Sequence, residues 1–311
     1  MAEPRHTPIS TLLAEPNDAR VKFSVEFMPP RDDAAEMRLW NAATAFQRLG
    51  VSFASVTYGA GGSTRDRTFR VAKRLAAMPL PTLVHLTLVE HSVAELTEIL
   101  SAYAQAELTN LLALRGDPPG DPLGEWRKDP AGLEYTKELI EHVRKTPASA
   151  HFDIGIAAFP EGHHRAANLE ADTSYTLEKL RAGANYAITQ VFFDAEHFLS
   201  LRDRLIAADP EQGTKPLVPG IMPITSLRSV EKQIELSGAT LPSAVAVRLN
   251  KAAASGPAAV REEGIALSTE MAEKLIAEGV PDLHFMTMNF AKATHEVLHN
   301  LGMAPAWQPA G

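Results

Sequence analysis

The sequence predicts a single (β/α)8 TIM barrel, an α/β fold, with extra helices between strands seven and eight. Three observations predict it. Short apolar runs alternate with single amphipathic stretches along the chain. The runs are nearly continuous in apolar residues, as expected of parallel strands buried on both faces. Finally, polar residues stand where several of the runs end, which is where such barrels keep their chemistry.

Eight runs have strand character: Val21–Phe27, Phe53–Tyr58, Thr82–Leu88, Leu111–Gly116, Asp153–Phe159, Asn185–Phe193, Leu217–Met222 and Asp282–Met288. Amphipathic helices long enough for right-handed crossovers lie between most of them, for example Ala34–Leu49, Ser92–Ala106, Leu133–Lys145, Asn168–Ala182 and Ala195–Ala208. Gly50 and Gly183 follow two of these helices, where a left-handed cap is favoured.

Two segments depart from a minimal barrel. Residues 118–130 are rich in Pro and Gly and predict a long loop on the ligand-binding face after strand four. Residues 227–278 have helical patterns without a strand and predict two or three helices between strands seven and eight. We therefore expect a loose N-terminal arm over residues 1–20, one barrel over 21–303 and a tail over 304–311.

Composition excludes several classes of function. The formal charge is −8 and the 30 Lys and Arg residues are scattered, so nucleic acid is not an expected partner. There is no Cys, which removes disulfides, thiolate nucleophiles and Cys-ligated metals. No stretch has the pattern of a signal peptide or a membrane span, so we expect no membrane partner and a cytoplasmic location.

Glu26 is a carboxylate at the end of an apolar strand, and burial in a barrel mouth predicts a raised pKa that suits a general acid. A solvated strand-end residue is the alternative. His85 ends the third run and could equally be a satisfied core residue. Arg115 and Asp117 flank Gly116, which offers a cation, an anion and an accessible backbone, although a structural ion pair would have the same pattern.

Two segments suggest a metal, and neither predicts one. Glu161, His163 and His164 are neighbours, but adjacent histidines in extended chain point in different directions. The segment from His295 to His299 matches HExxH, yet no Glu, Asp, His or Cys follows His299 as a further ligand. A zinc hydrolase is therefore the less favoured hypothesis. The glycine-rich segment 57–63 lacks both nucleotide-loop spacings and is only a weak signal.

Nine segments in register resemble methylenetetrahydrofolate reductase of the bacterial flavoprotein type: VEFMPPR, SVTYGAGGSTRDRT, HLT, ALRGD, FPEGHH, the stretch 172–179, GANYAITQVFFD, PGIMPI and HFMTMN. The resemblance runs from about residue 21 to about residue 303. It implies a barrel that binds FAD, takes a hydride from NADH or NADPH, and converts 5,10-methylenetetrahydrofolate to 5-methyltetrahydrofolate. It leaves a homo-oligomer open.

The resemblance also implies roles for individual residues. Glu26 would protonate N10 of the folate, Asp117 would lie near the flavin and the pterin, and Gln190 would orient the substrate. Leu227 and Met288 would also contact the substrate. The positions that would hold FAD are Thr57, His85, Leu114, Arg115, Gly116, Asp117, Tyr135, Ala157, Phe159, His163, Asp172, Lys179 and Ile188.

Four positions differ from the family pattern. Phe159 stands where relatives often have Tyr, Leu227 where some have a stacking Phe, and Phe290 where an Arg is common. His164 replaces a Pro. These changes keep open a flavin-independent reductase or a non-catalytic folate- or flavin-binding relative. A barrel lyase or aldolase with Glu26 and Asp117 as acid and base is a further alternative, although no Lys is expected at a strand end for a Schiff base.

Overall fold

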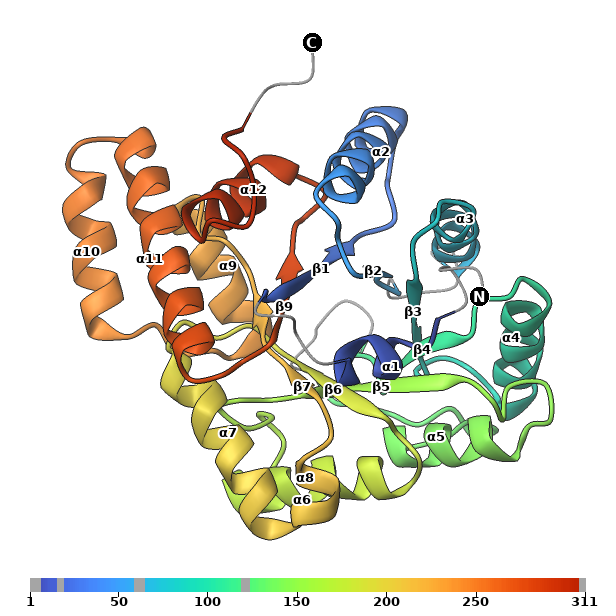
Figure 1. Ribbon diagram of the computed structural model, residues 1–311. Coiled ribbons are helices and arrows are strands. Elements are labelled where there is room, and N and C mark those ends of the chain that lie inside the picture. Colours follow the sequence, from blue (N-terminus) through green and yellow to red (C-terminus); the bar gives the residue numbers. More distant parts are fainter. Residues whose placement is uncertain (1–6, 16–19, 59–64, 119–123, 308–311) are drawn as a thin grey trace.

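A wall of parallel strands surrounded by helices forms the centre of the molecule in the computed structural model, which describes residues 7–15, 20–58, 65–118 and 124–307 (Figure 1). Every strand pair is parallel, and the hydrogen-bonded order is β7-β6-β5-β4-β3-β2-β1-β9-β8. The strands are β1 (Lys22–Phe27), β2 (Ala54–Val56), β3 (Thr82–Thr87), β4 (Asn110–Leu114), β5 (Asp153–Ala158), β6 (Tyr186–Thr189), β7 (Leu217–Val218), β8 (Gly220–Ile221) and β9 (Asp282–Met286).

The strands β7 and β8 are two halves of the predicted seventh strand, interrupted at Pro219. Pro219 has no N–H to donate to a neighbouring strand, although its carbonyl still accepts from the N–H of His284 at 3.0 Å. The first half pairs with β6 and the second half with β9, so the interrupted strand brings the two ends of the wall together. The predicted barrel of eight parallel strands is confirmed, with the seventh divided.

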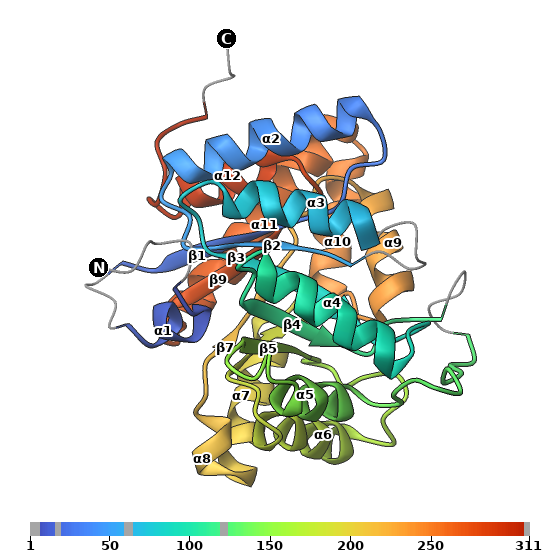
Figure 2. The same ribbon diagram turned by 90° about the vertical axis from the view of Figure 1, so that its right-hand side faces the viewer.

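Helices cover the outside of this wall on all sides (Figures 1 and 2). Those that alternate with strands are α2 (Asp33–Arg48), α3 (Arg65–Ala76), α4 (Val93–Gln105), α5 (Thr136–Lys145), α6 (Leu169–Arg181), α7 (Ala195–Ala208) with the short α8 (Pro210–Gly213), and α12 (Ala291–Asn300). The predicted extra helices between strands seven and eight are α9 (Leu227–Ser237), α10 (Ser243–Ala253) and α11 (Pro257–Ala277). Gly50 and Gly183 have the expected positive φ, +77° and +120°.

The barrel interior is an apolar layer that separates the two ends of the barrel. Side chains from successive strands fill it, and all of them are buried: Phe53, Leu83, Leu112, Tyr186, Ile188 and Val218. Gly155 belongs to this layer because a Cβ there would lie 2.6 Å from Tyr186 Cε2. A second, larger core lies between the wall and the surrounding helices. The site described below therefore has a solid apolar floor.

A short helix, α1 (Ile9–Ala14), covers the N-terminal end of the barrel (Figure 2). Ile9 and Leu13 join the interior layer, and the N–H of Ile9 donates to Asn110 Oδ1 at 3.0 Å. Ser10 donates twice to the Asp153 carboxylate, at 2.8 Å from its N–H and 2.6 Å from its hydroxyl. The expectation of a loose arm is therefore wrong for residues 9–14, because the first residues of β4 and β5 bind this helix. Residues 1–6, 16–19 and 308–311 lie outside the described ranges.

The strand predicted over Asn185–Phe193 is shorter in the structure, since β6 ends at Thr189. Gln190 thus begins a loop, although its N–H still donates to Ala158 O at 2.8 Å. Within the described ranges, no helix combines the length and the apolar composition that a membrane crossing requires.

Asp282→Asn is expected to stabilise the protein at alkaline pH. Burial raises the pKa of Asp282 from 3.8 to about 6, against the opposing charge of Lys22. The folded protein therefore retains a proton that the unfolded chain releases, and stability falls as the pH rises through this window. After allowance for screening by solvent and Lys22, Asn should add about 1–2 kcal/mol at pH 8, or about 2–3 °C in Tm.

Thermal unfolding of both proteins at pH 8 and pH 4 measures this difference. The gain should shrink toward pH 4, where the carboxyl is protonated in the folded protein and close to half protonated in the unfolded chain. Asp203→Asn is the matched control, because that carboxylate is 66% exposed and pairs with its neighbour Arg202. A gain that is equal at both pH values would contradict the electrostatic explanation.

Candidate active site

Three ionisable side chains meet inside the mouth of the barrel, one each from β1, β3 and β9. Glu26 Oε2 lies 3.6 Å from His85 Nε2 and 3.9 Å from His284 Nε2. The Glu26 side chain is 17% exposed, whereas the two imidazoles are 6% and 1% exposed. The carboxyl group is thus the member of this cluster that a ligand in the mouth can reach.

Burial by itself would raise the pKa of the Glu26 carboxyl, but interactions with His284 and then with His85 outweigh it, so the pKa is lowered. The expectation of a raised pKa is therefore wrong for the ligand-free protein. That expectation treated Glu26 as an isolated carboxyl, whereas two imidazoles lie beside it. Burial lowers the pKa of His85 to about 4, with the Glu26 charge opposing and His284 adding to the shift, so His85 is neutral at pH 7.

Arg115 and Gly116 follow β4 directly. Burial lowers the pKa of the Arg115 guanidinium, which lies 5.5 Å from the Trp126 ring and within 3.4 Å of His163 Nε2. Its Nε is buried and has no hydrogen-bond partner among the described residues. Gly116 has φ +84°, and a Cβ there would lie 2.6 Å from Val89 Cγ1, so this turn requires glycine.

His163, Asp172 and Lys179 form a second polar group beside Arg115. The N–H of His163 donates to Asp172 Oδ1 at 3.1 Å, while Asp172 Oδ2 is buried and has no hydrogen-bond partner in the part of the chain that the structure describes. Lys179 Nζ donates to Ala157 O at 2.8 Å, and burial lowers the pKa of Lys179 to about 8. Burial and the cations around it lower the pKa of His163 to about 3. Together with Arg115, the group therefore combines two cations with an unsatisfied carboxylate oxygen.

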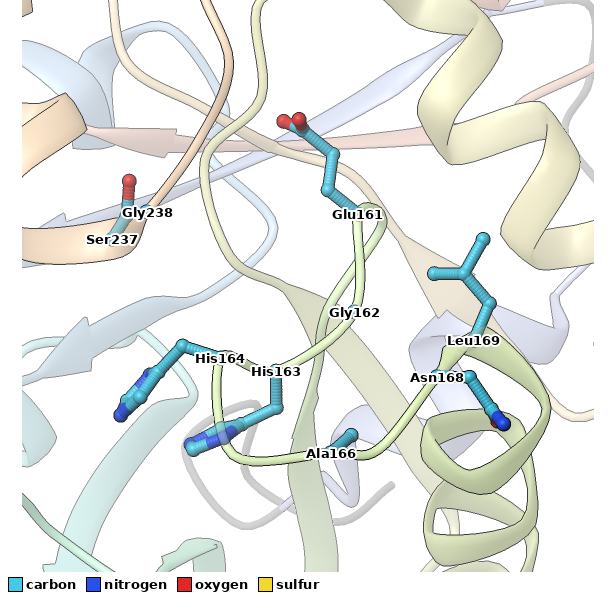
Figure 3. A pocket seen from close by; sticks show the side chains of 9 residues that line it. All are labelled: Glu161, Gly162, His163, His164, Ala166, Asn168, Leu169, Ser237 and Gly238. Carbon is cyan, nitrogen blue, oxygen red and sulfur yellow. The ribbon is translucent and has the colours of Figure 1, made fainter.

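A cavity of about 310 Å³ lies next to this second group (Figure 3). The segment from Glu161 to Leu169 lines one side, and Ser237 with Gly238, at the end of α9, lines the other. The imidazoles of His163 and His164 are stacked, with ring centroids 4.4 Å apart. The Glu161 carboxylate accepts the N–H of Thr240 at 3.0 Å and lies 3.3 Å from His197 Nδ1, which ties this loop to the helical insertion.

The remaining predicted residues lie on separate strand ends and loops at the same end of the barrel. Leu114, Ala157 and Ile188 are in β4, β5 and β6, and Thr57 follows β2. Phe159 packs edge-on against His163, at 4.7 Å between centroids. Asp117 is exposed beside Arg115, and Gln190 folds its amide oxygen back onto the N–H of Val191. Tyr135 precedes α5, Leu227 begins α9 and Met288 follows β9.

Sequence reasoning missed two residues at this mouth, His284 and Asn289. Asn289 holds the backbone of Met28 from both sides, because its Oδ1 accepts from Met28 N and its Nδ2 donates to Met28 O, each at 2.8 Å. Met288 and Asn289 have φ of +52° and +62°, a costly conformation for residues other than glycine. The only signal in the sequence was their place in the segment HFMTMN.

A sequence model of the family "Methylenetetrahydrofolate reductase" matches residues 11–302 of this chain. The chain belongs to the methylenetetrahydrofolate reductase family. This confirms the family that the nine segments predicted. The 5,10-methylenetetrahydrofolate reductases of Salmonella typhimurium and Escherichia coli are each 34% identical over 289 residues, which are 92% of this chain and 92% of theirs. The Zea mays protein named "Methylenetetrahydrofolate reductase (NADH) 1" is 33% identical. The match covers 97% of this chain and 53% of that longer protein.

Solved structures with low sequence identity support the barrel fold of this reductase family member. A protein from Clostridium thermocellum that binds two copies of 5-methyl-5,6,7,8-tetrahydrofolic acid has a TM-score of 0.64 at 13% identity, over 90% of this chain and 94% of its own. An oxaloacetate acetylhydrolase has a TM-score of 0.54 at 12% identity, over 94% and 82%. At such identities the likeness concerns the fold alone.

The HExxH match in this family member lies on α12, where each side chain has another partner. His295 packs against Trp307, Glu296 Oε2 lies 2.7 Å from Arg261, and the ring of His299 lies 3.0 Å from Ala304 O. Across the described ranges, no three His, Asp or Glu side chains are arranged to hold a metal ion. The geometry gives no support to the zinc-hydrolase hypothesis.

Proposed function

We propose that this protein reduces 5,10-methylenetetrahydrofolate to 5-methyltetrahydrofolate, with FAD as the bound cofactor and NADH or NADPH as the reductant. The observation that carries the proposal is the pair of polar groups at one barrel mouth. One group contains the Glu26 carboxyl, which a ligand in the mouth can reach. The other group contains two cations, Arg115 and Lys179, and the Asp172 carboxylate with its unsatisfied oxygen. The first suits proton donation to a folate, and the second suits a dinucleotide.

The residues present fit FAD. Arg115 and Lys179 would hold the pyrophosphate, because both are partly buried cations. Asp172 Oδ2 lacks a donor that a ribose hydroxyl would supply, and Gly116 allows the backbone to approach the ligand closely. The walls around these groups would come from the other cofactor positions: Thr57, His85, Leu114, Tyr135, Ala157, Phe159, His163 and Ile188. When bound, FAD would supply the hydride.

Glu26 supplies the proton in this proposal. Protonation of N10 by its carboxyl breaks the bond between N10 and the one-carbon unit and leaves an N5 iminium that accepts hydride. A folate that covers the mouth removes water from Glu26, which favours the protonated carboxyl over the ionised one. Asp117 and Gln190 orient the pterin, while Leu227 and Met288 contact the rest of the substrate.

A visible spectrum followed by anaerobic titration tests the function. The purified protein, supplied with FAD if necessary, should be yellow, should bleach with NADH or NADPH, and should regain its colour when methylenetetrahydrofolate is added. No flavin binding together with no oxidation of either nucleotide in the presence of the folate and FAD would contradict the proposal.

A flavin-independent reductase is the second candidate, and the substitutions at Phe159, Leu227 and Phe290 favour it. The Phe159 ring has no hydroxyl to donate, and Phe290 is exposed with Arg38 at 5.6 Å from its centroid. A colourless preparation that oxidises NAD(P)H with the folate, and gains nothing from added FAD, would support this candidate instead.

A further inference from the structure

Three large apolar side chains are exposed on the rim of the barrel mouth, close to Glu26. They are Met28, Met288 and Phe290, with exposed fractions of 37%, 45% and 57%. Met28 is the second residue after Glu26, so about 7 Å separates the two along an extended chain. Met288 and Phe290 belong to the segment between β9 and α12. Together the three residues form a rim patch, and neighbouring exposed side chains of this size indicate a binding surface.

Hydrogen bonds between the two segments hold the rim patch in a fixed place. The Asn289 side chain binds both backbone polar groups of Met28, each at 2.8 Å, which ties the end of β1 to the segment after β9. Thr287 Oγ1 also donates to the carbonyl oxygen of Glu26 at 2.7 Å. Met288 and Asn289 keep a positive φ, and such strained residues cluster at binding sites. The rim patch is therefore fixed relative to Glu26.

Arg38, on α2, places a cation at the edge of the rim patch. Its guanidinium carbon lies over the Phe290 ring, 5.6 Å from the ring centroid. The helices α2 and α12 pack side by side, and α12 begins directly after Phe290 (Figures 1 and 2). Glu36, two residues before Arg38, pairs instead with Arg70 and Arg74. Within the described ranges, no carboxylate forms an ion pair with Arg38, so its charge is available to a ligand.

We propose that the rim patch and Arg38 bind the p-aminobenzoyl-glutamate end of the folate. The inference rests on the proposed function. In a folate, N10 is bonded to the p-aminobenzoyl ring, and the glutamate follows on the other side of that ring. A substrate with N10 at Glu26 therefore extends first an aromatic ring and then carboxylates away from the Glu26 carboxyl. The rim presents matching chemistry in the same order, because the apolar patch comes first and the guanidinium of Arg38 lies at its edge.

The exposure of Arg38 determines how strongly it can act. A pair between an exposed guanidinium and one carboxylate is screened by water and salt, so a single glutamate should gain little from it. A polyglutamate tail adds a carboxylate with each residue and raises the negative charge near the guanidinium. We therefore expect folate affinity to rise with the number of glutamates and to fall as salt is added.

Arg38→Gln tests the inference by direct binding, without turnover. The probes are 5-methyltetrahydropteroate, which has no glutamate, and 5-methyltetrahydrofolate with one or three glutamates, each titrated anaerobically by isothermal calorimetry. The variant should bind the triglutamate about five- to tenfold more weakly than wild type and the monoglutamate about threefold more weakly, with less than about a twofold change for the pteroate. Added salt should weaken triglutamate binding more in wild type than in the variant.

Arg48→Gln is the matched control, because Arg48 is an exposed arginine in the last turn of the same helix, and all three affinities should stay unchanged. Arg38→Lys retains the charge and should recover part of the preference for the triglutamate. It also shows whether a loss in Arg38→Gln comes from the charge.

Equal triglutamate affinity in Arg38→Gln and wild type would overturn the inference, as would equal losses for all three probes. Weaker binding of NADH or NADPH with unchanged folate affinities would also overturn it, since Arg38 would then serve the reductant. In each of these cases, wild type that binds the folates leaves the proposed function standing. Wild type that binds none of them would contradict both.

Discussion

Glu26→Gln is expected to lower the rate of folate reduction at least about a thousandfold while flavin reduction by NAD(P)H stays within about twofold. Gln has nearly the shape of Glu but carries no acidic proton, so N10 would leave without protonation. The Glu26 side chain points into the mouth and is 17% exposed, so the exchange disturbs little packing. The reductive half-reaction needs no acid at this position and should proceed normally.

Anaerobic stopped-flow measurement of the two half-reactions separates these effects. The flavin absorbance falls when NADH is mixed with the oxidised protein and recovers when the folate is mixed with the reduced protein. Glu98→Gln, on the exposed face of α4, is the matched control and should change neither rate. If Glu26→Gln slows both half-reactions equally, Glu26 is not the acid but part of the flavin site.

Arg115→Gln is expected to weaken FAD binding about 10- to 100-fold. The guanidinium is partly buried between Trp126 and His163, and no described residue accepts a hydrogen bond from its Nε. It can therefore contribute a charge-assisted hydrogen bond to a phosphate. Gln retains a polar end but loses the charge. The expected loss of FAD affinity is smaller than the loss from removing the whole site, because Lys179 remains as a second cation.

The dissociation constant of FAD, measured by equilibrium dialysis of flavin-depleted protein, reports this change without any turnover. Arg127→Gln is the matched control, since that arginine follows the same strand but is 81% exposed and pairs with Glu125. Equal FAD affinity in Arg115→Gln and wild type would remove the guanidinium from the proposed pyrophosphate site.

The fold was largely predictable because buried parallel strands need continuous apolar runs, and these runs are visible in one dimension. The helical insertion was predictable for the same reason, since residues 227–278 lack such a run. The helix α1 was not. Its six residues contain apolar side chains at Ile9 and Leu13, but they have a burial site only where Asn110, Asp153 and the barrel interior come together.

The candidate site was predictable in position and less so in chemistry. Glu26 and Arg115 lie at the carboxyl ends of β1 and β4, and His85 lies in the second half of β3. Parallel strands place their carboxyl ends at one edge, so the sequence alone determined the mouth on which these residues lie. Only the tertiary structure decided that His284, from the last strand, lies under Glu26 and reverses the direction of its pKa shift. Strand order follows from local patterns, whereas a pKa depends on charges within a few ångströms that distant segments supply.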